Sequence, residues 1–329
     1  MPFSRSKRPG LSYSSYACFY FPDGNEGLAL RYEHCEEDQR WFYRFSWFHL
    51  MRPLTWSGTI SPVLAATALA AKKGAVRIDV LLAMLAASVL IQSAVNMLND
   101  YFDRLRGQDV DKWTNKHDDG PAHRSIPAVA SAMLTAAVAL GAYLAWQSYA
   151  AIAWIGTVAI ICGIAYSAGP RPLASLGLGE LTAATCMGPV VTVLAYAVQR
   201  HAPNAAPFAL SIPFALLIAS MILTNNIRDI EKDRPFRRTL AIRLGRKNAA
   251  RLLAVLLAST YLSIAVLIFW HVVPLLAAIT VLALPLAIRL CLCFRPSASR
   301  AEEISGMKWA ARHHWAVGLL LTLSLWLSP

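Results

Sequence analysis

VLLAMLAASVLIQSAVNMLNDYFD, residues 80–103, is apolar over most of its length and ends in a segment with two asparagines and two aspartates. An apolar run of about 20 residues is long enough to cross the hydrocarbon core of a bilayer as a helix. A helix also pairs the backbone polar groups that lipid cannot solvate. We therefore expect a membrane-spanning helix that carries carboxylates at one end.

The rest of the chain has the same apolar character. Its 329 residues are 56% hydrophobic and 15% charged, with a mean hydropathy of +0.44, whereas a soluble domain averages about 45–50% apolar and about 25% charged residues. This composition excludes a soluble globular enzyme, a disordered chain and a disulfide scaffold; the six cysteines are scattered and are interpreted as packing residues. We expect an all-α integral membrane protein with about nine transmembrane helices, near residues 53–71, 78–98, 127–146, 149–166, 178–198, 206–225, 249–269, 272–290 and 310–327.

The charge distribution predicts the orientation in the membrane. The chain has 31 Lys and Arg against 19 Asp and Glu, a net charge of +12. In a soluble protein this excess would suggest a nucleic-acid partner, but most of these basic residues fall in alternate connections between apolar runs. We therefore predict no nucleic-acid partner and a multi-pass protein, of the inner or plasma membrane if the source is bacterial. Its N-terminus and its loops near 99–126 and 226–248 are expected to face the cytoplasm.

Residues 1–50 precede the first apolar run and lack the apolar core of a signal peptide. We expect them to form a cytoplasmic extension that is partly interfacial. An interfacial helix is predicted near Trp41–Leu50, because aromatic residues are concentrated there. Residues 51–329 are expected to form the transmembrane domain.

Two acidic clusters each follow an apolar run, and both runs are predicted to end on the cytoplasmic side. The first cluster has the helical spacing i, i+4, i+7 at Asn96, Asp100 and Asp103. The second has the spacing i, i+4, i+8 at Asn225, Asp229 and Asp233. Each set lies on one face of its helix, and the repeated pattern suggests an internal duplication. A single acidic cluster is usually a solvated helix end, but two matching clusters indicate a site.

Two facing stacks of carboxylates repel one another unless cations lie between them. Asp and Asn oxygens suit hard divalent ions, and Mg²⁺ usually takes one or two carboxylates together with phosphate oxygens of a substrate. The pattern therefore predicts a diphosphate held through bridging Mg²⁺. Basic side chains that would take the remaining phosphate charge follow the second cluster: Arg228, Lys232, Arg234, Arg237, Arg238 and Arg243.

At these residues the sequence resembles the UbiA superfamily of intramembrane prenyltransferases, and within it the 1,4-dihydroxy-2-naphthoate prenyltransferases of menaquinone biosynthesis. The resemblance extends over about residues 45–325. The stretches that carry it are Arg52-Pro53-Leu54-Thr55, Asn99-Asp100-Tyr101-x-Asp103, Gly107-x-Asp109, Gly120-Pro121, Tyr166-Ser167-Ala168-Gly169-Pro170-Arg171-Pro172-Leu173, Gly177-x-Gly179-Glu180, Gly188-Pro189, Asn225-Asn226-x-Arg228-Asp229 and Arg238-Thr239-Leu240-Ala241. Two segments depart from the family pattern, namely Ala122-His123-Arg124 and Pro235-Phe236.

The resemblance implies a bundle of nine helices with a central cavity and cytoplasmic cap loops. It implies Mg²⁺-dependent transfer of a prenyl group from an allylic isoprenyl diphosphate to a carbon of a small aromatic acceptor. The implied catalytic residues are Asp100, Asp103, Asp229, Asp233 and Tyr166, of which the four aspartates would hold Mg²⁺ through the bound diphosphate. The implied diphosphate-binding residues are Asn96, Asn99, Arg171, Asn225, Arg228, Lys232 and Arg238.

Several roles stay open. The allylic cation needs aromatic faces, for which Tyr101, Phe102 and Tyr166 are candidates. Glu180 begins an apolar run and is expected to act either as a proton acceptor or as a structural partner of an arginine. A bicyclic phenol such as 1,4-dihydroxy-2-naphthoate is the expected acceptor, with a hydroxyquinoline or similar ring as the alternative. A terpene cyclase with the same diphosphate motifs, or a transporter, are rival functions; the sequence does not indicate the oligomeric state.

Overall fold

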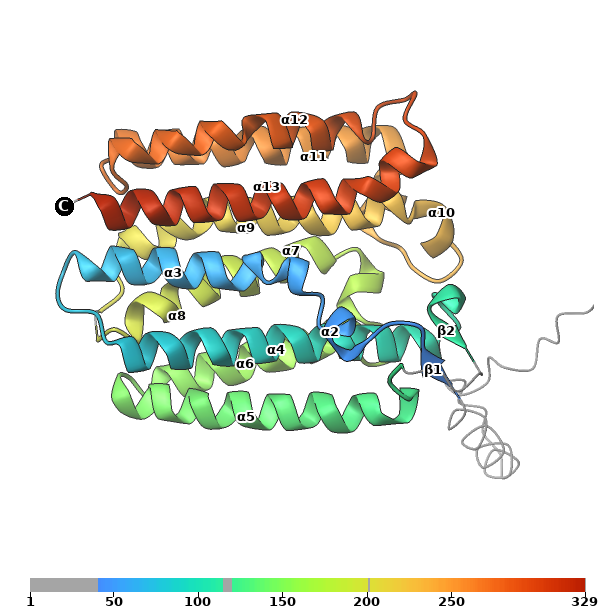
Figure 1. The fold of residues 1–329 in the computed structure, drawn as a ribbon, viewed down its shortest axis with the longest axis horizontal. Helices are drawn as coiled ribbons and strands as arrows, with labels where there is room; N and C mark the ends of the chain where they lie inside the picture. The colour runs from blue at the N-terminus through green and yellow to red at the C-terminus, as the bar shows by residue number, and fades with distance from the viewer. Residues whose placement is uncertain (1–40, 115–119, 201, 329) are drawn as a thin grey trace, which may run out of the picture.

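The computed structural model describes residues 41–114, 120–200 and 202–328 of the protein. Long helices lie side by side in a bundle, with short elements at one end (Figure 1). The predicted extension before residue 41 lies outside the described residues. The elements in chain order are β1 (Phe42–Tyr43), α2 (Trp47–Leu50), η3 (Pro53–Thr55), α3 (Ser57–Ala71), α4 (Ile78–Leu105), η4 (Val110–Lys112), β2 (Trp113–Thr114), η5 (His123–Ser125), α5 (Ile126–Gln147), α6 (Ala151–Ser167), η6 (Leu173–Leu176), α7 (Gly179–Thr185), η7 (Cys186–Val190), α8 (Val191–Ala197), α9 (Ala205–Arg228), α10 (Ile230–Asp233), α11 (Leu240–Phe269), η8 (Leu275–Ala283), α12 (Leu284–Leu292) and α13 (Arg300–Leu327).

The prediction of a helical multi-pass membrane protein is confirmed. In the described part of the chain, six helical segments are long and apolar enough to cross a bilayer: Ile78–Leu105, His123–Gln147, Gly179–Ala197, Ala205–Arg228, Leu240–Phe269 and Leu275–Leu292. A seventh span is possible if Trp47–Thr55 and Ser57–Ala71, which meet at a bend of 50°, cross as one unit. Helix α6 is apolar but has only 17 residues. Helix α13 has 28 residues, but Arg312, His313 and His314 lower its hydropathy.

The helices pack in two groups. In one group α4 packs against α5 and α6; in the other α9 packs against α11 and α13, and α12 packs against α13. Helix α3 and the segment α7–η7–α8 lie between the groups and contact both (Figure 1). This arrangement places the C-terminal ends of α4 and α9, where the two acidic clusters begin, at the same end of the bundle.

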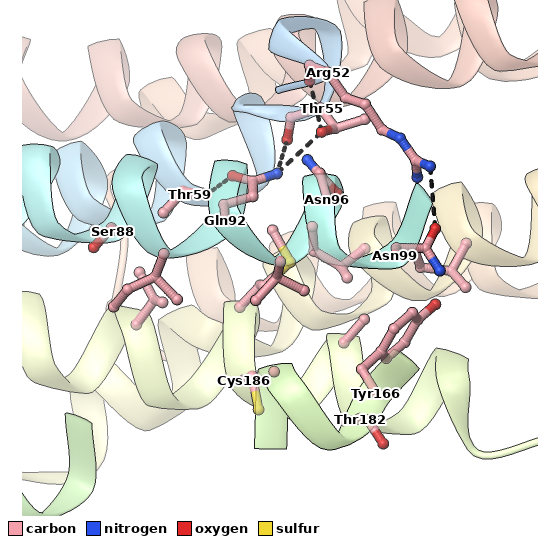
Figure 2. Close-up of a pocket in the computed structure, with 18 of the residues that line it drawn as sticks. Arg52, Thr55, Thr59, Ser88, Gln92, Asn96, Asn99, Tyr166, Thr182 and Cys186 are labelled. Carbon is pink, nitrogen blue, oxygen red and sulfur yellow. Dashed lines mark hydrogen bonds between the residues drawn. The ribbon is translucent and has the colours of Figure 1, made fainter. Parts of the chain in front are cut away.

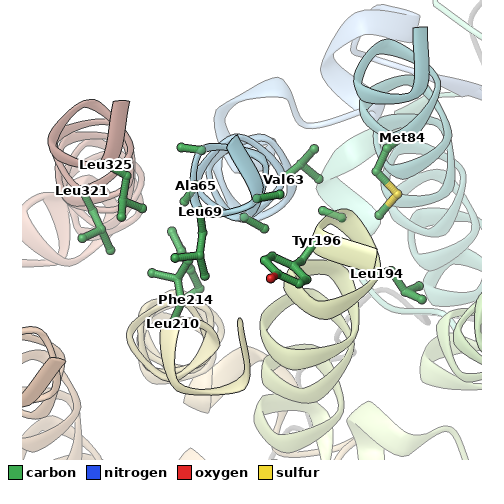
Figure 3. Close-up of a cluster of buried hydrophobic side chains, with 14 of the residues drawn as sticks. Val63, Ala65, Leu69, Met84, Leu194, Tyr196, Leu210, Phe214, Leu321 and Leu325 are labelled. Carbon is green, nitrogen blue, oxygen red and sulfur yellow. The ribbon is translucent and has the colours of Figure 1, made fainter. Parts of the chain in front are cut away.

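A large apolar core closes the opposite end. Figure 3 shows α3, α8, α9 and α13 meeting there, with Leu321 and Leu325 of α13 near α3 and Phe214 of α9 directed toward the same cluster. Small residues on α3, including Ala65, let neighbouring helices approach closely. The result is a rigid base beneath the space between the two helix groups.

The end with the acidic clusters carries a small cap. Strand β1 pairs antiparallel with β2, with Phe42 opposite Thr114 and Tyr43 opposite Trp113. The interfacial helix expected near Trp41–Leu50 is therefore shorter than predicted, because only Trp47–Leu50 is helical and Phe42–Tyr43 form a strand. The fold is thus all-helical except for this one two-stranded sheet among the described residues.

A close approach between helices explains the Gly188-Pro189 pair. Residues Cys186–Val190 form a π-helical turn between α7 and α8, and Pro189 lies inside it. A Cβ added at Gly188 would lie 2.7 Å from the Cβ and 2.8 Å from the Cα of Ala215 in α9. The second of these atoms is backbone, so it cannot turn away as a side chain can.

We therefore expect Gly188→Ala to destabilise the protein by about 1–3 kcal/mol through overpacking. The matched control is Gly141→Ala in α5, where nothing lies within 4 Å of the added Cβ and helix propensity favours alanine. Thermal unfolding in detergent should show a lower midpoint for Gly188→Ala alone. Equal midpoints for the two variants would contradict this account of the contact between η7 and α9.

Candidate active site

A cavity of about 840 Å³ lies between the helix groups. Side chains from α3, α4, α5, α6, α7, α8, α9 and α13 line it. Its membrane-embedded part is mainly apolar, and its open end, called the mouth here, is lined by Asp103, Asp109, Asp229 and Asp233. The described residues thus form the central cavity that the sequence led us to expect.

The first acidic set at the mouth consists of Asn99, Asp103 and Asp109. Asn99 and Asp103 are one helical turn apart near the end of α4, and both line the cavity. Asn99 accepts a hydrogen bond from Arg52 at 3.1 Å and donates one to Ser167 at 3.0 Å. The chain then turns at Gly107 and at Asp109, which both have positive φ (71° and 56°), and this turn brings Asp109 back to the mouth.

Asp100 does not line the cavity, in contrast to the expectation from the sequence. It is 3% exposed and accepts from the Arg52 Nη2 at 2.9 Å and the Lys112 Nζ at 2.6 Å. Three residues of a helix span about 300° of rotation, so Asp100 and Asp103 point only about 60° apart, and the pairing with Arg52 and Lys112 holds the Asp100 carboxylate outside the cavity lining. Asn96 does line the cavity, and it donates to the Met51 carbonyl at 3.0 Å.

The second acidic set consists of Asn225, Asp229 and Asp233, which all line the cavity. Helix α9 ends at Arg228 and α10 begins at Ile230, so Asp229 occupies the break between them. Arg228 pairs with Asp229 and also donates to the Asn225 side chain at 2.8 Å. Asp233 is 6% exposed, and burial raises its pKa to about 6, although the positive charge of Arg237 opposes the shift.

Basic side chains connect the two acidic sets. Arg237 reaches from beyond α10 to Asp103 at 2.5 Å, and Lys232 pairs with Asp109. Lys112 also contacts Asp109 at 2.7 Å. Burial alone would raise the pKa of Asp109, but Lys112 and Lys232 hold it well below its usual range. The sets therefore face each other with cations between them, as the repulsion argument requires.

Four basic residues named from the sequence lie elsewhere, namely Arg171, Arg234, Arg238 and Arg243. Arg171 and Arg238 are exposed and are absent from the cavity lining. The backbone N–H of Arg238 donates to the Ser175 carbonyl at 2.9 Å. The side chain that lines the mouth is that of the preceding residue, Arg237. Lys232 and Arg228 line the mouth as expected.

Sequence reasoning did not assign Arg52, Lys112 or Asp109 to the site. Arg52 has a left-handed backbone conformation (φ 55°) just before Pro53, and this turn returns its side chain to Asn99 and Asp100. A signal existed, because Arg52 and Asp109 both belong to the stretches that carry the family resemblance. Lys112 had no comparable signal.

Tyr166 lines the cavity, whereas the other two aromatic candidates do not. The Tyr101 ring stacks on His123 at 4.5 Å, and Phe102 packs edge-on against Tyr101 at 5.3 Å. Glu180 is 6% exposed, and its Oε1 accepts from the Asn226 Nδ2 at 2.8 Å. The hydrogen-bond partner of Glu180 is thus an asparagine of the cavity wall and not an arginine, while its role as a proton acceptor stays a prediction.

A polar ladder continues below the mouth on α4. Ser88, Gln92, Asn96 and Asn99 line the cavity at successive helical turns (Figure 2). Gln92 donates to the Thr55 carbonyl at 2.7 Å and accepts from Thr59, so it joins α4 to η3 and α3. One wall of the cavity can thus hydrogen-bond a polar ligand, while Met187 and Ile218 on other walls are apolar.

The donor set suits a metal that is carried by a ligand. Among the residues that the structure describes, no three His, Cys, Asp or Glu side chains converge as a ready-made metal site. Mg²⁺ usually keeps several non-protein ligands and takes only one or two carboxylates beside substrate phosphates. The separated carboxylates of the mouth fit Mg²⁺ in that mode and do not fit a metal bound by protein alone.

The model of the UbiA prenyltransferase family matches residues 59–312. The chain is 33% identical over 288 residues to a 1,4-dihydroxy-2-naphthoate octaprenyltransferase of Bacillus subtilis (strain 168), with 85% of this chain and 92% of that protein covered. It shares its fold with the apo structure of a UbiA homolog from Aeropyrum pernix K1 (TM-score 0.59, 17% identity, 81% and 96% covered). It is similar also to a UbiA homolog from Archaeoglobus fulgidus bound to GPP and Mg²⁺ (TM-score 0.53, 18% identity, 84% and 99% covered).

These likenesses agree with the site. The all-helical membrane fold agrees with the family that the sequence resembles, and the branch that the resemblance singled out is the branch of the Bacillus relative. The family model matches well over half of the chain, which is enough to establish membership of the family. This membrane protein belongs to the UbiA prenyltransferase family.

Proposed function

We propose that this membrane prenyltransferase transfers a prenyl group from an allylic isoprenyl diphosphate to a carbon of 1,4-dihydroxy-2-naphthoate, in a reaction that requires Mg²⁺. The observation that carries the proposal is the pair of acidic sets that face each other across the mouth of a membrane-embedded cavity, with Arg237 and Lys232 between them. The naphthoate acceptor is supported by the name and 33% identity of the Bacillus relative.

In this reaction the mouth holds the diphosphate and the cavity holds the prenyl chain. When bound, Mg²⁺ would polarise the diphosphate oxygens as a Lewis acid, and the residues placed to hold it are Asp103, Asp109, Asp229 and Asp233. The bond between the allylic carbon and oxygen breaks, and its electron pair leaves with the diphosphate. A ring carbon of the acceptor then bonds to the allylic carbon, and the ring loses a proton.

The neighbouring side chains have separate tasks. Arg228, Lys232 and Arg237 are free to contact phosphate oxygens once the carboxylates turn to the metal. Asn99 and Asn225 provide neutral oxygens next to the carboxylates of each set. Tyr166 offers an aromatic face to the allylic cation, a contact worth about 0.5–2 kcal/mol. Arg171 and Arg238 have no place in this assignment, because both lie away from the cavity.

We also propose a topology of nine crossings with the mouth on the cytoplasmic side. Helices α6 and α13 would then cross with the other spans, although one is short and the other polar in the middle. The arrangement of the ends supports this proposal, because β1 lies at the cap and the end of α13 lies at the opposite end of the bundle (Figure 1). An odd number of crossings joins two such ends.

The acidic residues are expected to differ in their effects. Asp103→Asn, Asp229→Asn and Asp233→Asn should each lower turnover by more than about 100-fold, roughly 2.7 kcal/mol. Asp100→Asn should keep more than about a tenth of turnover but lower the unfolding midpoint, because Arg52 and Lys112 lose a buried charged partner. Prenylation assays and melting curves on purified protein test this, and an Asp100→Asn variant that is stable but inactive would contradict it.

Removal of divalent cations is expected to abolish turnover, since carboxylates and diphosphate repel one another without them. Purified protein treated with EDTA should regain activity when Mg²⁺ is added in excess, but not when Na⁺ is added at equal ionic strength. Full activity in the presence of EDTA would show that the acidic sets have another role.

The acceptor prediction concerns the size of the ring. A fused bicyclic phenol should be prenylated faster than 4-hydroxybenzoate, because a larger ring is held more closely between the polar wall at Gln92 and the apolar wall at Met187. Product formation with both acceptors, each tested with geranyl, farnesyl and longer diphosphates, measures this preference. A higher kcat/KM for 4-hydroxybenzoate than for any bicyclic acceptor would overturn it.

A further inference from the structure

The segment Trp41–Arg44 contacts the loop that supplies part of the active site. We propose that this segment is a positioning device, in which Tyr43 fixes the backbone that presents Lys112 and Asp109 to the diphosphate. The inference rests on the proposed function, since it assigns a role within the same site. In the following, the cap loop means residues 106–114 together with 120–125.

Backbone hydrogen bonds join the segment to both parts of the cap loop. The Arg44 N–H donates to the Lys112 carbonyl at 3.0 Å, and the Tyr43 N–H donates to the Pro121 carbonyl at 2.9 Å. The His123 N–H donates in turn to the Trp41 carbonyl at 2.9 Å. The segment is thus held between two stretches of the cap loop, and it connects them.

Gly120 shows how closely these chains approach. A Cβ added at Gly120 would lie 1.7 Å from the Tyr43 carbonyl oxygen, so any other residue would push the two chains apart. Gly120 therefore makes room for the Tyr43 backbone because it has no side chain, and the Pro121 carbonyl accepts a hydrogen bond from the Tyr43 N–H.

The Tyr43 side chain anchors the arrangement from within. It is completely buried, its ring meets Trp113 edge-on at 5.2 Å, and its hydroxyl hydrogen-bonds the His123 Nδ1 at 3.1 Å. His123 stacks on Tyr101 of α4 with the rings 14° from parallel. One aromatic side chain thus ties together β1, the cap loop and the end of α4 that carries the first acidic set.

The cap loop then reaches the active site through Lys112. Its backbone is held by Arg44, and its ammonium group contacts Asp100 at 2.6 Å and Asp109 at 2.7 Å. Asp109 in turn pairs with Lys232 of α10. Contacts therefore lead from the Tyr43 segment through Lys112 to Asp109 of the first set and on to Lys232 of α10, and a shift of the cap loop displaces a cation and a carboxylate at the mouth.

The effect of losing Tyr43 should be local. Its apolar neighbours are Leu50, Met97, Trp113 and Ile126, a small cluster separate from the two large cores within the bundle. Removal of the ring therefore frees the cap loop and leaves the main helix packing intact.

The test compares Tyr43→Ala with the control Phe45→Ala, which removes a ring of the same segment that is 42% exposed. Hydrogen exchange of residues 106–114 in the purified full-length protein should become faster in Tyr43→Ala only. The KM for the prenyl diphosphate should rise at least about 10-fold in that variant, with the KM for the acceptor unchanged. If Tyr43→Ala does not fold, Tyr43→Phe replaces it, with faster exchange and an increase of about 3-fold expected from the loss of one hydrogen bond.

Unchanged exchange of residues 106–114, or equal rises in both KM values, would overturn the proposal. A purely structural role would lower the amount of active protein and leave both KM values as they are, which also counts against it. The exchange measurement needs no substrate. It therefore separates a failure of this inference from a failure of the proposed function, which would show as wild-type protein inactive with every donor and acceptor.

Discussion

Repulsion between two sets of carboxylates is the constraint on which the mouth of the cavity depends. Asp103 and Asp109 from one half of the chain face Asp229 and Asp233 from the other, in a place that burial makes unfavourable for charge. Basic residues between the sets offset this cost, and Arg237 and Lys232 do so across the boundary between the halves. The same cations are available to a diphosphate, so the compensation that stabilises the protein alone also prepares it for its substrate.

The fold satisfies this constraint by ending two helices at one level. Helix α4 carries the first set at its C-terminal end, and α9 breaks at Asp229 so that α10 can return Asp233 to the same mouth. A helix group stands behind each set, and an apolar core joins the groups at the far end. The cavity between them is therefore charged at the mouth and mainly apolar below it, apart from the polar ladder on α4.

Much of this arrangement could be predicted from local pattern, and the exceptions have definite causes. Apolar runs predicted a helical multi-pass membrane protein, in which six described segments are long and apolar enough to span, and the spacing of Asp229 and Asp233 placed both on one helix face, where both line the cavity. The first set was less determined, because Asn96, Asn99 and Asp103 all line the cavity, whereas Asp100 is held outside its lining by Arg52 and Lys112, which come from distant turns of the chain. The sequence pattern could not decide whether Arg237 or Arg238 lines the mouth. The Arg238 backbone is bonded to Ser175, a contact between distant segments that helical periodicity does not predict.

Pairing between distant segments was also beyond sequence patterns. The aromatic residues around Tyr43 suit a membrane interface equally well, and only the pairing of β1 with β2, some 70 residues further along the chain, shows that this side chain is buried in the cap. The role of Lys112 could not be predicted for the same reason, because its contacts with Asp100 and Asp109 depend on how the cap loop folds.

The central claim is that the two acidic sets bind metal only together with a diphosphate. Electron paramagnetic resonance of Mn²⁺, titrated into purified protein with and without a non-reactive thiolodiphosphate analogue of the donor, tests it most directly. The account predicts weak Mn²⁺ binding to the protein alone and tight binding once the analogue is present, with the tight sites lost in Asp103→Asn and Asp233→Asn. Tight stoichiometric Mn²⁺ binding without the analogue, or tight binding of the analogue without any divalent ion, would contradict it.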